Sequence, residues 1–173
     1  MKDFDGSHDS RYWMARNADE LAALVDTTRS AGLRFVFELH HGYVVNSASA
    51  ALRLLERHDP NRVGILMDPG NMVFEGNEGW RNAVQLMGPY LAYIHCKNAQ
   101  FVREGNAWRR RWASLEEGIA DYGELMTALK DEGFSGYLSI EDLRREIPVD
   151  TRVGGGIRYL RGLDTSTVRI LPV

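Results

Sequence analysis

Residues 31–40 read AGLRFVFELH, and residues 132–142 read EGFSGYLSIED. In both stretches the end of a helical pattern is followed by a glycine, the residue favoured in the left-handed position after a helix. A short run rich in apolar residues comes next and ends in a glutamate, Glu38 or Glu141. This repetition predicts a repeated architecture of helix, glycine turn and strand.

Four apolar runs of this kind, each bounded by turn-forming residues, divide the chain into segments. They cover residues 33–39, 63–68, 91–97 and 136–141. Helical spacing fills the segments around them, at residues 19–31, 46–58, 78–88, 121–132 and 150–163. Strands and helices thus alternate in units of about 30 residues, which favours βαβ connections and a parallel sheet.

The predicted strands have two different faces, because alternate side chains of a strand point to opposite sides. One face is uniformly apolar: Phe35, Phe37, Val63, Ile65, Met67, Ala92, Ile94, Cys96, Leu138 and Ile140. The other is mixed and ends in a polar group at each strand: Arg34, Val36 and Glu38; Gly64, Leu66 and Asp68; Leu91, Tyr93 and His95; Tyr137, Ser139 and Glu141. An outer face for helices opposite a mixed inner face is what a (β/α) barrel requires. The predicted fold class is therefore α/β, of the TIM-barrel type, with four parallel strands alternating with helices as a half barrel.

Glu38, Asp68, His95 and Glu141 end the four strands on the inner face, at the edge where such barrels place their chemistry. A strand-end acid taken singly often caps a loop or forms a surface ion pair. Three carboxylates and an imidazole that converge, however, repel one another and lose hydration unless a cation lies among them. The mixed oxygen and nitrogen set predicts one divalent metal ion, Mn²⁺, Mg²⁺, Co²⁺ or Zn²⁺.

Four motifs carry a family resemblance: FVFELH at 35–40, GILMDPGN at 64–71, YIHCKN at 93–98 and GYLSIED at 136–142. Together they resemble the C-terminal half of the sugar isomerase/epimerase superfamily, the xylose isomerase-like TIM barrels. The resemblance implies that Glu38, Asp68, His95 and Glu141 bind the metal. It also implies that Glu38 and Glu141 are the catalytic acid/base pair.

Three further residues are candidates for substrate binding. Asn71 stands where ketose epimerases of the family carry a substrate-contacting histidine, and Lys97 follows His95 as in the family's H-x-K-D motif. Asn98 replaces the acid of that motif. His40 shares strand parity with Glu38 and is expected to contact substrate or orient that carboxylate, whereas its neighbour His41 is a candidate loop cap.

The function expected from these residues is a metal-dependent sugar isomerase or epimerase. A metal that polarises a carbonyl acidifies the neighbouring C–H, so that proton transfer proceeds through an enediolate of a small sugar or hydroxycarbonyl substrate. The alternative is a non-catalytic metal- or ligand-binding half barrel. A relation to the DNA-repair endonuclease branch of the superfamily is a third option, but its cluster of several metal ions needs more histidines than the chain contains.

The chain of 173 residues is expected to form a single domain over 1–173, with an N-terminal extension at 1–18, an inserted loop at 99–114 and a C-terminal tail at 164–173. The inserted loop contains Trp108, Arg109, Arg110, Arg111 and Trp112. It could be a lid that stacks aromatic rings on a sugar and clamps an anion. It could equally be a solvated basic loop, or one that packs on a neighbouring subunit.

Size and composition limit the partners. A closed barrel of this type needs about 250 residues, so four strands cannot close alone. Either the protein is longer, or two copies associate as a homodimer. A net charge of −3 gives little support for nucleic-acid binding. The absence of a long apolar stretch or signal peptide in the sequence leads us to expect a cytoplasmic protein that does not enter a membrane.

Overall fold

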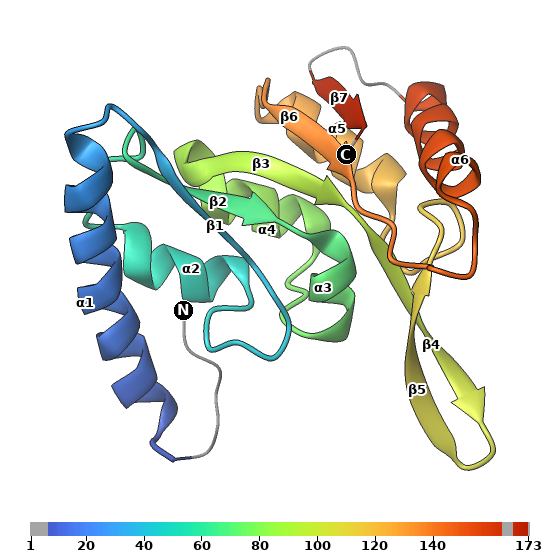
Figure 1. The fold of residues 1–173 in the computed structure, drawn as a ribbon, viewed down its shortest axis with the longest axis horizontal. Helices are drawn as coiled ribbons and strands as arrows, with labels where there is room; N and C mark the ends of the chain where they lie inside the picture. Colours follow the sequence, from blue (N-terminus) through green and yellow to red (C-terminus); the bar gives the residue numbers. More distant parts are fainter. Residues whose placement is uncertain (1–6, 164–167, 173) are drawn as a thin grey trace.

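A computed structural model describes residues 7–163 and 168–172 of the chain (Figure 1). Helices and strands alternate along most of it. In chain order the elements are α1 (Ser10–Arg29), β1 (Phe35–Glu38), α2 (Ala48–Leu55), β2 (Val63–Met67), α3 (Pro69–Phe74), α4 (Trp80–Met87), a short 3₁₀ turn η1 (Gly88–Tyr90), β3 (Leu91–Cys96), β4 (Asn98–Glu104), β5 (Ala107–Ala113), α5 (Tyr122–Asp131), β6 (Tyr137–Ile140), α6 (Val149–Gly162) and β7 (Arg169–Pro172).

The main sheet is parallel, with strand order β1-β2-β3-β6-β7. Its first four strands are those predicted from the apolar runs, and they are joined through helices in the way that parallel neighbours require. The predicted α/β fold class of the TIM-barrel type is therefore confirmed. The described strands form an open sheet, with β1 and β7 at its two edges.

Local sequence signals account for where the elements begin and end. The Ser47 side chain caps α2 by accepting a hydrogen bond from the Ala50 backbone N–H at 3.2 Å. Asp68 and Asp121 cap α3 and α5 in the same way. Gly133, which follows α5, has φ +69°, a conformation that glycine adopts without strain. The turn into β6 thus has the form that the repeated sequence predicted.

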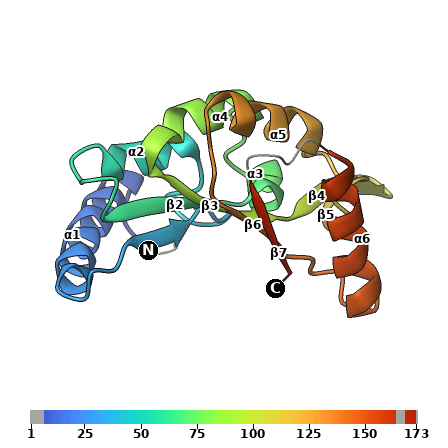
Figure 2. The same cartoon turned by 90° about the horizontal axis from the view of Figure 1, so that it is seen from above.

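The two faces of the sheet differ as the strand parity predicted. Phe37, Ile65, Ile94 and Leu138 lie buried beneath the helices. Figure 2 shows α2, α4 and α5 arching over this side of the strands, with α1 and α6 at the two ends. On the opposite face Val36 and Tyr137 keep 36% and 38% of their surface exposed. The inner face of the predicted barrel is therefore open in this chain.

The N-terminal helix begins earlier than the sequence analysis predicted. It was placed at residues 19–31, but α1 begins at Ser10, within the segment expected to be an extension. The Asp9 side chain accepts a hydrogen bond from the Tyr12 backbone N–H at 3.0 Å and caps the helix there. Trp13, Asn17, Leu21 and Val25 then form one buried stripe at four-residue spacing.

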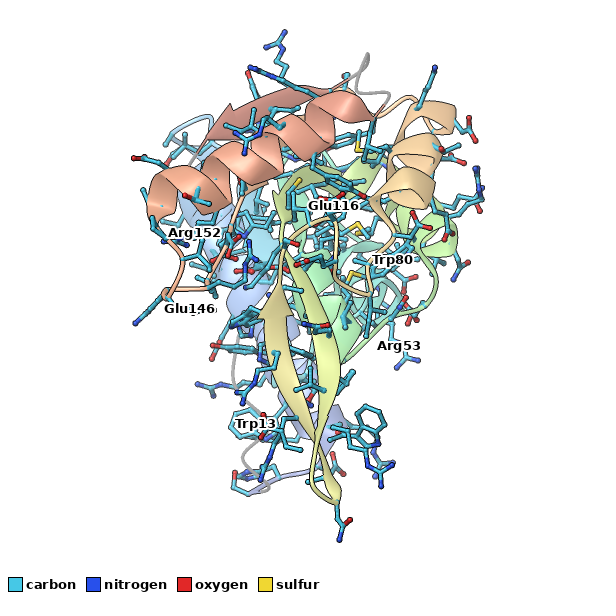
Figure 3. The ribbon with its side chains drawn as sticks, turned by 90° about the vertical axis from the view of Figure 1, so that its right-hand side faces the viewer. Trp13, Arg53, Trp80, Glu116, Glu146 and Arg152 are labelled. Carbon is cyan, nitrogen blue, oxygen red and sulfur yellow. The ribbon has the colours of Figure 1, made fainter. Side chains whose placement is uncertain are left out.

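Two other segments also contain regular structure. The insertion at residues 99–114, expected to be a loop, is mostly an antiparallel hairpin of β4 and β5 that extends away from the main sheet (Figures 1 and 3). The tail at 164–173 contributes β7, which pairs in parallel with β6. The main sheet thus has one strand more than the four predicted. None of the described helices has the length and apolarity that a membrane span needs.

Candidate metal centre

Four side chains meet at the C-terminal edge of the sheet. Glu38 is the last residue of β1, Asp68 follows β2, His95 lies near the end of β3, and Glu141 follows β6. Each offers one ligand atom, and these atoms all lie within 4.8 Å of one another. The convergence that the strand ends predicted is thus observed.

The imidazole of His95 lies among the carboxylates. Its Nδ1 is 3.5 Å from Glu38 Oε1, 3.5 Å from Glu141 Oε2 and 3.9 Å from Asp68 Oδ2. That nitrogen is buried and has no hydrogen-bond partner. A buried polar atom without a partner is costly unless a ligand satisfies it. One nitrogen and three carboxylate oxygens around a common point fit a divalent cation such as Mg²⁺, Mn²⁺, Co²⁺ or Zn²⁺.

The electrostatics of Glu38 and Asp68 show how these carboxylates share charge without a cation. Burial raises the pKa of Asp68 well above its usual value, although Lys97 and the Asn71 backbone N–H act in the opposite direction. Burial would also raise the pKa of Glu38, but its contacts with His95 and Asp68, and the charge of Lys97, lower it to about 2. Burial thus favours the protonated form of Asp68, whereas a bound cation would favour its ionised form.

Lys97 supplies positive charge beside the four residues, and only 3% of its side chain is exposed. Its Nζ donates to Glu141 Oε2 at 2.9 Å and to Asp68 Oδ2 at 3.2 Å. Burial would lower the pKa of this ammonium, but Asp68 and Glu141 outweigh that effect and raise it. Gly70 allows α3 to lie close to Lys97, because a Cβ at position 70 would be only 2.7 Å from Lys97 Cγ.

Asn71 connects the candidate ligands to the surrounding loops. Its Nδ2 donates to Glu38 Oε1 at 3.0 Å, and its backbone N–H donates to Asp68 Oδ1 at 2.9 Å. His41 Nδ1 lies 2.8 Å from Asn71 Oδ1. The structure therefore gives Asn71 contacts that orient Glu38 and Asp68, and it brings His41 to the site through Asn71.

His40, selected from strand parity, lies beside Glu38 with a different set of contacts. Its Nδ1 is 2.7 Å from the His41 carbonyl oxygen, and its ring stacks on His41 with centroids 4.5 Å apart. Together with Phe37, Glu38 and Tyr43 it lines a small cavity of about 190 Å³. Strand parity could not predict the contact of His41 with Asn71, because β1 ends at Glu38 and the alternation of side chains does not continue beyond it.

A larger cavity of about 590 Å³ lies above the site, between the hairpin, α3 and the segment that follows β6. Trp112 and His41 line it. The Trp112 ring lies 4.4 Å from Lys97 Nζ, so the cavity is one side chain away from the carboxylates. The sequence marked Trp112 only as part of an unusual basic insertion. Its place over Lys97 depends on the hairpin, which was not predicted.

Comparison with curated proteins finds inosose dehydratases. The enzyme of Clostridium perfringens is 24% identical over 156 residues, which covers 80% of this chain and 50% of that protein. The enzyme of Geobacillus thermodenitrificans is 23% identical over 134 residues, with 71% of this chain and 45% of that protein covered. The chain thus spans about half the length of the curated relatives it matches.

Solved structures share the fold. A xylose isomerase domain protein from Planctomyces limnophilus matches with a TM-score of 0.67 and 24% identity, over 95% of this chain and 55% of that one. A xylose isomerase-like TIM barrel protein from Mycobacterium smegmatis, in complex with magnesium, matches with a TM-score of 0.71 and 18% identity, over 92% and 53%. A D-psicose 3-epimerase, solved in the presence of D-fructose, matches with a TM-score of 0.70 and 16% identity. This match covers 94% of this chain and 60% of that one.

A protein-family model also matches the chain. The match extends over residues 4–163, which is most of the chain. The protein accordingly belongs to the family described as the xylose isomerase-like TIM barrel.

Proposed function

We propose that the chain carries the metal-binding half of an enzyme that isomerises, epimerises or dehydrates a small sugar or hydroxycarbonyl compound. The observation that carries this proposal is the meeting of Glu38, Asp68, His95 and Glu141, with the unpartnered Nδ1 of His95 among the three carboxylates. The inosose dehydratases and D-psicose 3-epimerase found among similar proteins support this class of substrate.

Each of the four residues has a role in this proposal. Glu38, Asp68, His95 and Glu141 hold one divalent cation, which supplies a Lewis acid that polarises a carbonyl and acidifies the adjacent C–H. Glu38 and Glu141 each lie 3.5 Å from His95 Nδ1, and they come from the two outer members, β1 and β6, of the four strands that carry the site. We assign these two carboxylates the transfer of the substrate proton.

The neighbouring residues position substrate and ligands. The low pKa of Glu38 keeps this carboxylate ionised at neutral pH, the form that a proton acceptor needs. Lys97 Nζ lies 2.9 Å from Glu141 Oε2, where it could also donate to a substrate oxygen that gains negative charge. We assign His40 and Asn71 to substrate binding next to Glu38.

Exchange of substrate C–H protons with solvent tests this function. The Mn²⁺-loaded protein is incubated with a panel of ketoses and inososes in deuterated water, and deuterium incorporation is followed by NMR. Glu38→Gln and Glu141→Gln should each reduce exchange by at least about a hundredfold, because each removes one proton carrier. Glu56→Gln, at the exposed C-terminal end of α2, is the matched control and should exchange at the wild-type rate.

A non-catalytic half barrel is the second candidate, and the open inner face favours it. Val36 and Tyr137 would be covered inside a complete barrel, yet both are more than one third exposed here. A protein that binds Mn²⁺ at the four residues but exchanges no C–H proton of any ketose or inosose would support this reading. It would reject the enzymatic one for the isolated chain.

A further inference from the structure

The cavity above the metal centre has walls from separate segments of the chain. Trp112 and Arg110 come from β5, Phe74 from the end of α3, and Arg144 from the segment after β6. It encloses about 590 Å³, the size of a small-molecule site. Trp112, which lines the cavity, contacts Lys97 beside the metal centre. A substrate held at the metal by its carbonyl could therefore extend its other end into this cavity.

One wall of the cavity is aromatic. Trp112 lies 4.9 Å from Phe74 and 5.9 Å from His41, measured between ring centroids, and Phe74 lies 5.2 Å from His41. Burial lowers the pKa of His41, which favours the neutral form of this ring. The rings meet at interplanar angles of 48° to 83°, so they form an aromatic corner in which a sugar C–H face can pack on a single ring.

The arginines of the cavity are already neutralised by carboxylates. Arg110 Nη2 donates to Glu75 Oε1 at 2.8 Å, and Arg111 donates to Glu104. Arg144, only 18% exposed, donates to Asp142 Oδ2 at 2.7 Å. Glu146 adds a further negative charge to the lining and is labelled in Figure 3. The hairpin was expected either to clamp an anion or to remain solvated, but these pairs leave the cavity without excess positive charge.

Paired arginines and carboxylates suit a different ligand. They present N–H donors and oxygen acceptors side by side, and a hydroxyl group both donates and accepts. A phosphate would have to compete with Glu75 and Asp142 for the arginines, and it would approach Glu146. We propose that this cavity binds the uncharged, hydroxyl-bearing end of the substrate, stacked on Trp112, and discriminates against a phosphorylated one. The identity of the substrate as a sugar rests on the proposed function.

Binding of two matched probes to the Mn²⁺-loaded protein tests this inference. D-fructose and D-fructose 6-phosphate differ by the phosphate, and their dissociation constants are measured by calorimetry. D-fructose should bind at least about tenfold more tightly, because the phosphate loses hydration without gaining an unpaired cation. Tighter binding of the phosphorylated probe, or binding of neither probe, overturns the inference.

Substitutions in the cavity test which residues contact the probes. Trp112→Ala should weaken D-fructose binding about tenfold through loss of the stacking surface. Trp108→Ala is the matched control from the same strand, since Trp108 is 67% exposed and lies outside the cavity lining. Glu75→Gln frees Arg110 and should shift the ratio of the two dissociation constants toward the phosphorylated probe by about tenfold. An unchanged ratio in Glu75→Gln, or equal losses in the two tryptophan variants, contradicts the assignment.

These measurements are independent of turnover. A chain that exchanges substrate protons but prefers the phosphorylated probe refutes the inference and leaves the proposed function standing. A chain that prefers D-fructose but exchanges no protons supports the inference, and the proposed enzymatic function fails on its own.

Discussion

Asp68 is fully buried among the candidate ligands, and burial raises its pKa well above the usual value. A metal ion binds the ionised carboxylate, so that below the raised pKa metal binding has to release the proton of Asp68. The affinity for Mn²⁺ is therefore expected to fall as the pH falls through the raised pKa of Asp68, and to level off above it. Calorimetry between about pH 5 and pH 8, in buffers of different ionisation enthalpy, should also show proton release on binding. An affinity independent of pH over this range would contradict the shift.

Lys97 neutralises the site when no metal is bound, because its Nζ contacts Asp68 and Glu141 at 3.2 and 2.9 Å. Lys97→Met leaves the buried Asp68 carboxyl and the partly exposed Glu141 without a cation and should lower the free energy of unfolding of the metal-free protein by about 3 kcal/mol. Added Mn²⁺ should recover part of that loss. Urea unfolding with and without Mn²⁺ measures both effects.

The exposed Arg158→Met variant on α6 is the control for this measurement and should unfold like the wild type. Equal stability of Lys97→Met and Arg158→Met in the absence of metal would mean that Lys97 does not stabilise the metal-free site.

Strand parity was enough to predict the convergence of Glu38, Asp68, His95 and Glu141. The reason is physical: parallel strands in register carry their last inward side chains to a common edge. The contact of His41 with Asn71 lay outside this reasoning, because His41 follows the end of β1. The roles of His40, Asn71 and Lys97 toward a substrate stay predictions.

Asn98 anchors the start of the β4–β5 hairpin and the segment that leads to α5. Its Nδ2 donates to the Leu115 and Ala120 carbonyl oxygens, and its Oδ1 accepts from the Ala99 and Ala120 backbone N–H groups. Asn98→Asp would place a carboxylate against two carbonyl oxygens at a buried position. It should cost about 2–3 kcal/mol of unfolding free energy, measured by urea denaturation.

The exposed Asn106→Asp variant, at the turn between β4 and β5, is the matched control and should change stability by less than about 0.5 kcal/mol. A stable Asn98→Asp protein would show that the four hydrogen bonds of Asn98 are not needed. The same four bonds suggest why an amide can stand where the family's motif has an acid.

Elements with strong local signals were predictable. The four inner strands are apolar runs between turn-formers, and α2 and α5 have clear caps at Ser47 and Asp121. The hairpin was not predictable, because the exposed arginines of β5 hide the alternation that marks a strand. Strand β7 is short and includes Pro172, and it is defined by its pairing with β6 rather than by its own pattern.

The whole chain exposes a sheet face and two sheet edges that a closed barrel would cover. Val36 and Tyr137 are 36% and 38% exposed on that face, and β1 and β7 each pair on one side only within the described chain. Exposed edges and apolar faces promote association. We expect the isolated chain to form a dimer through these faces, as the predicted homodimer requires, and sedimentation equilibrium measures its mass.

Val36→Lys should weaken this association at least about tenfold, because the interface would bury an ammonium group from each copy. Val149→Lys, at a 55% exposed position on α6, is the control and should associate as the wild type does. A wild-type chain that stays monomeric at about 100 μM, far above the dissociation constant of a stable dimer, would disprove the dimer.

At the scale of the molecule, composition and periodicity predicted an open half of a barrel, and the structure agrees. How the open face is covered does not follow from the sequence, because closure depends on surfaces outside the chain.

The stoichiometry of Mn²⁺ binding tests the central claim most directly. Titration of the metal-free protein, followed by electron paramagnetic resonance, should give one tightly bound Mn²⁺ for each chain. His95→Gln should lower the affinity for Mn²⁺ by at least about a hundredfold, because it deletes the nitrogen ligand among the carboxylates. Failure of the wild type to bind Mn²⁺, or unchanged binding by His95→Gln, would contradict the account.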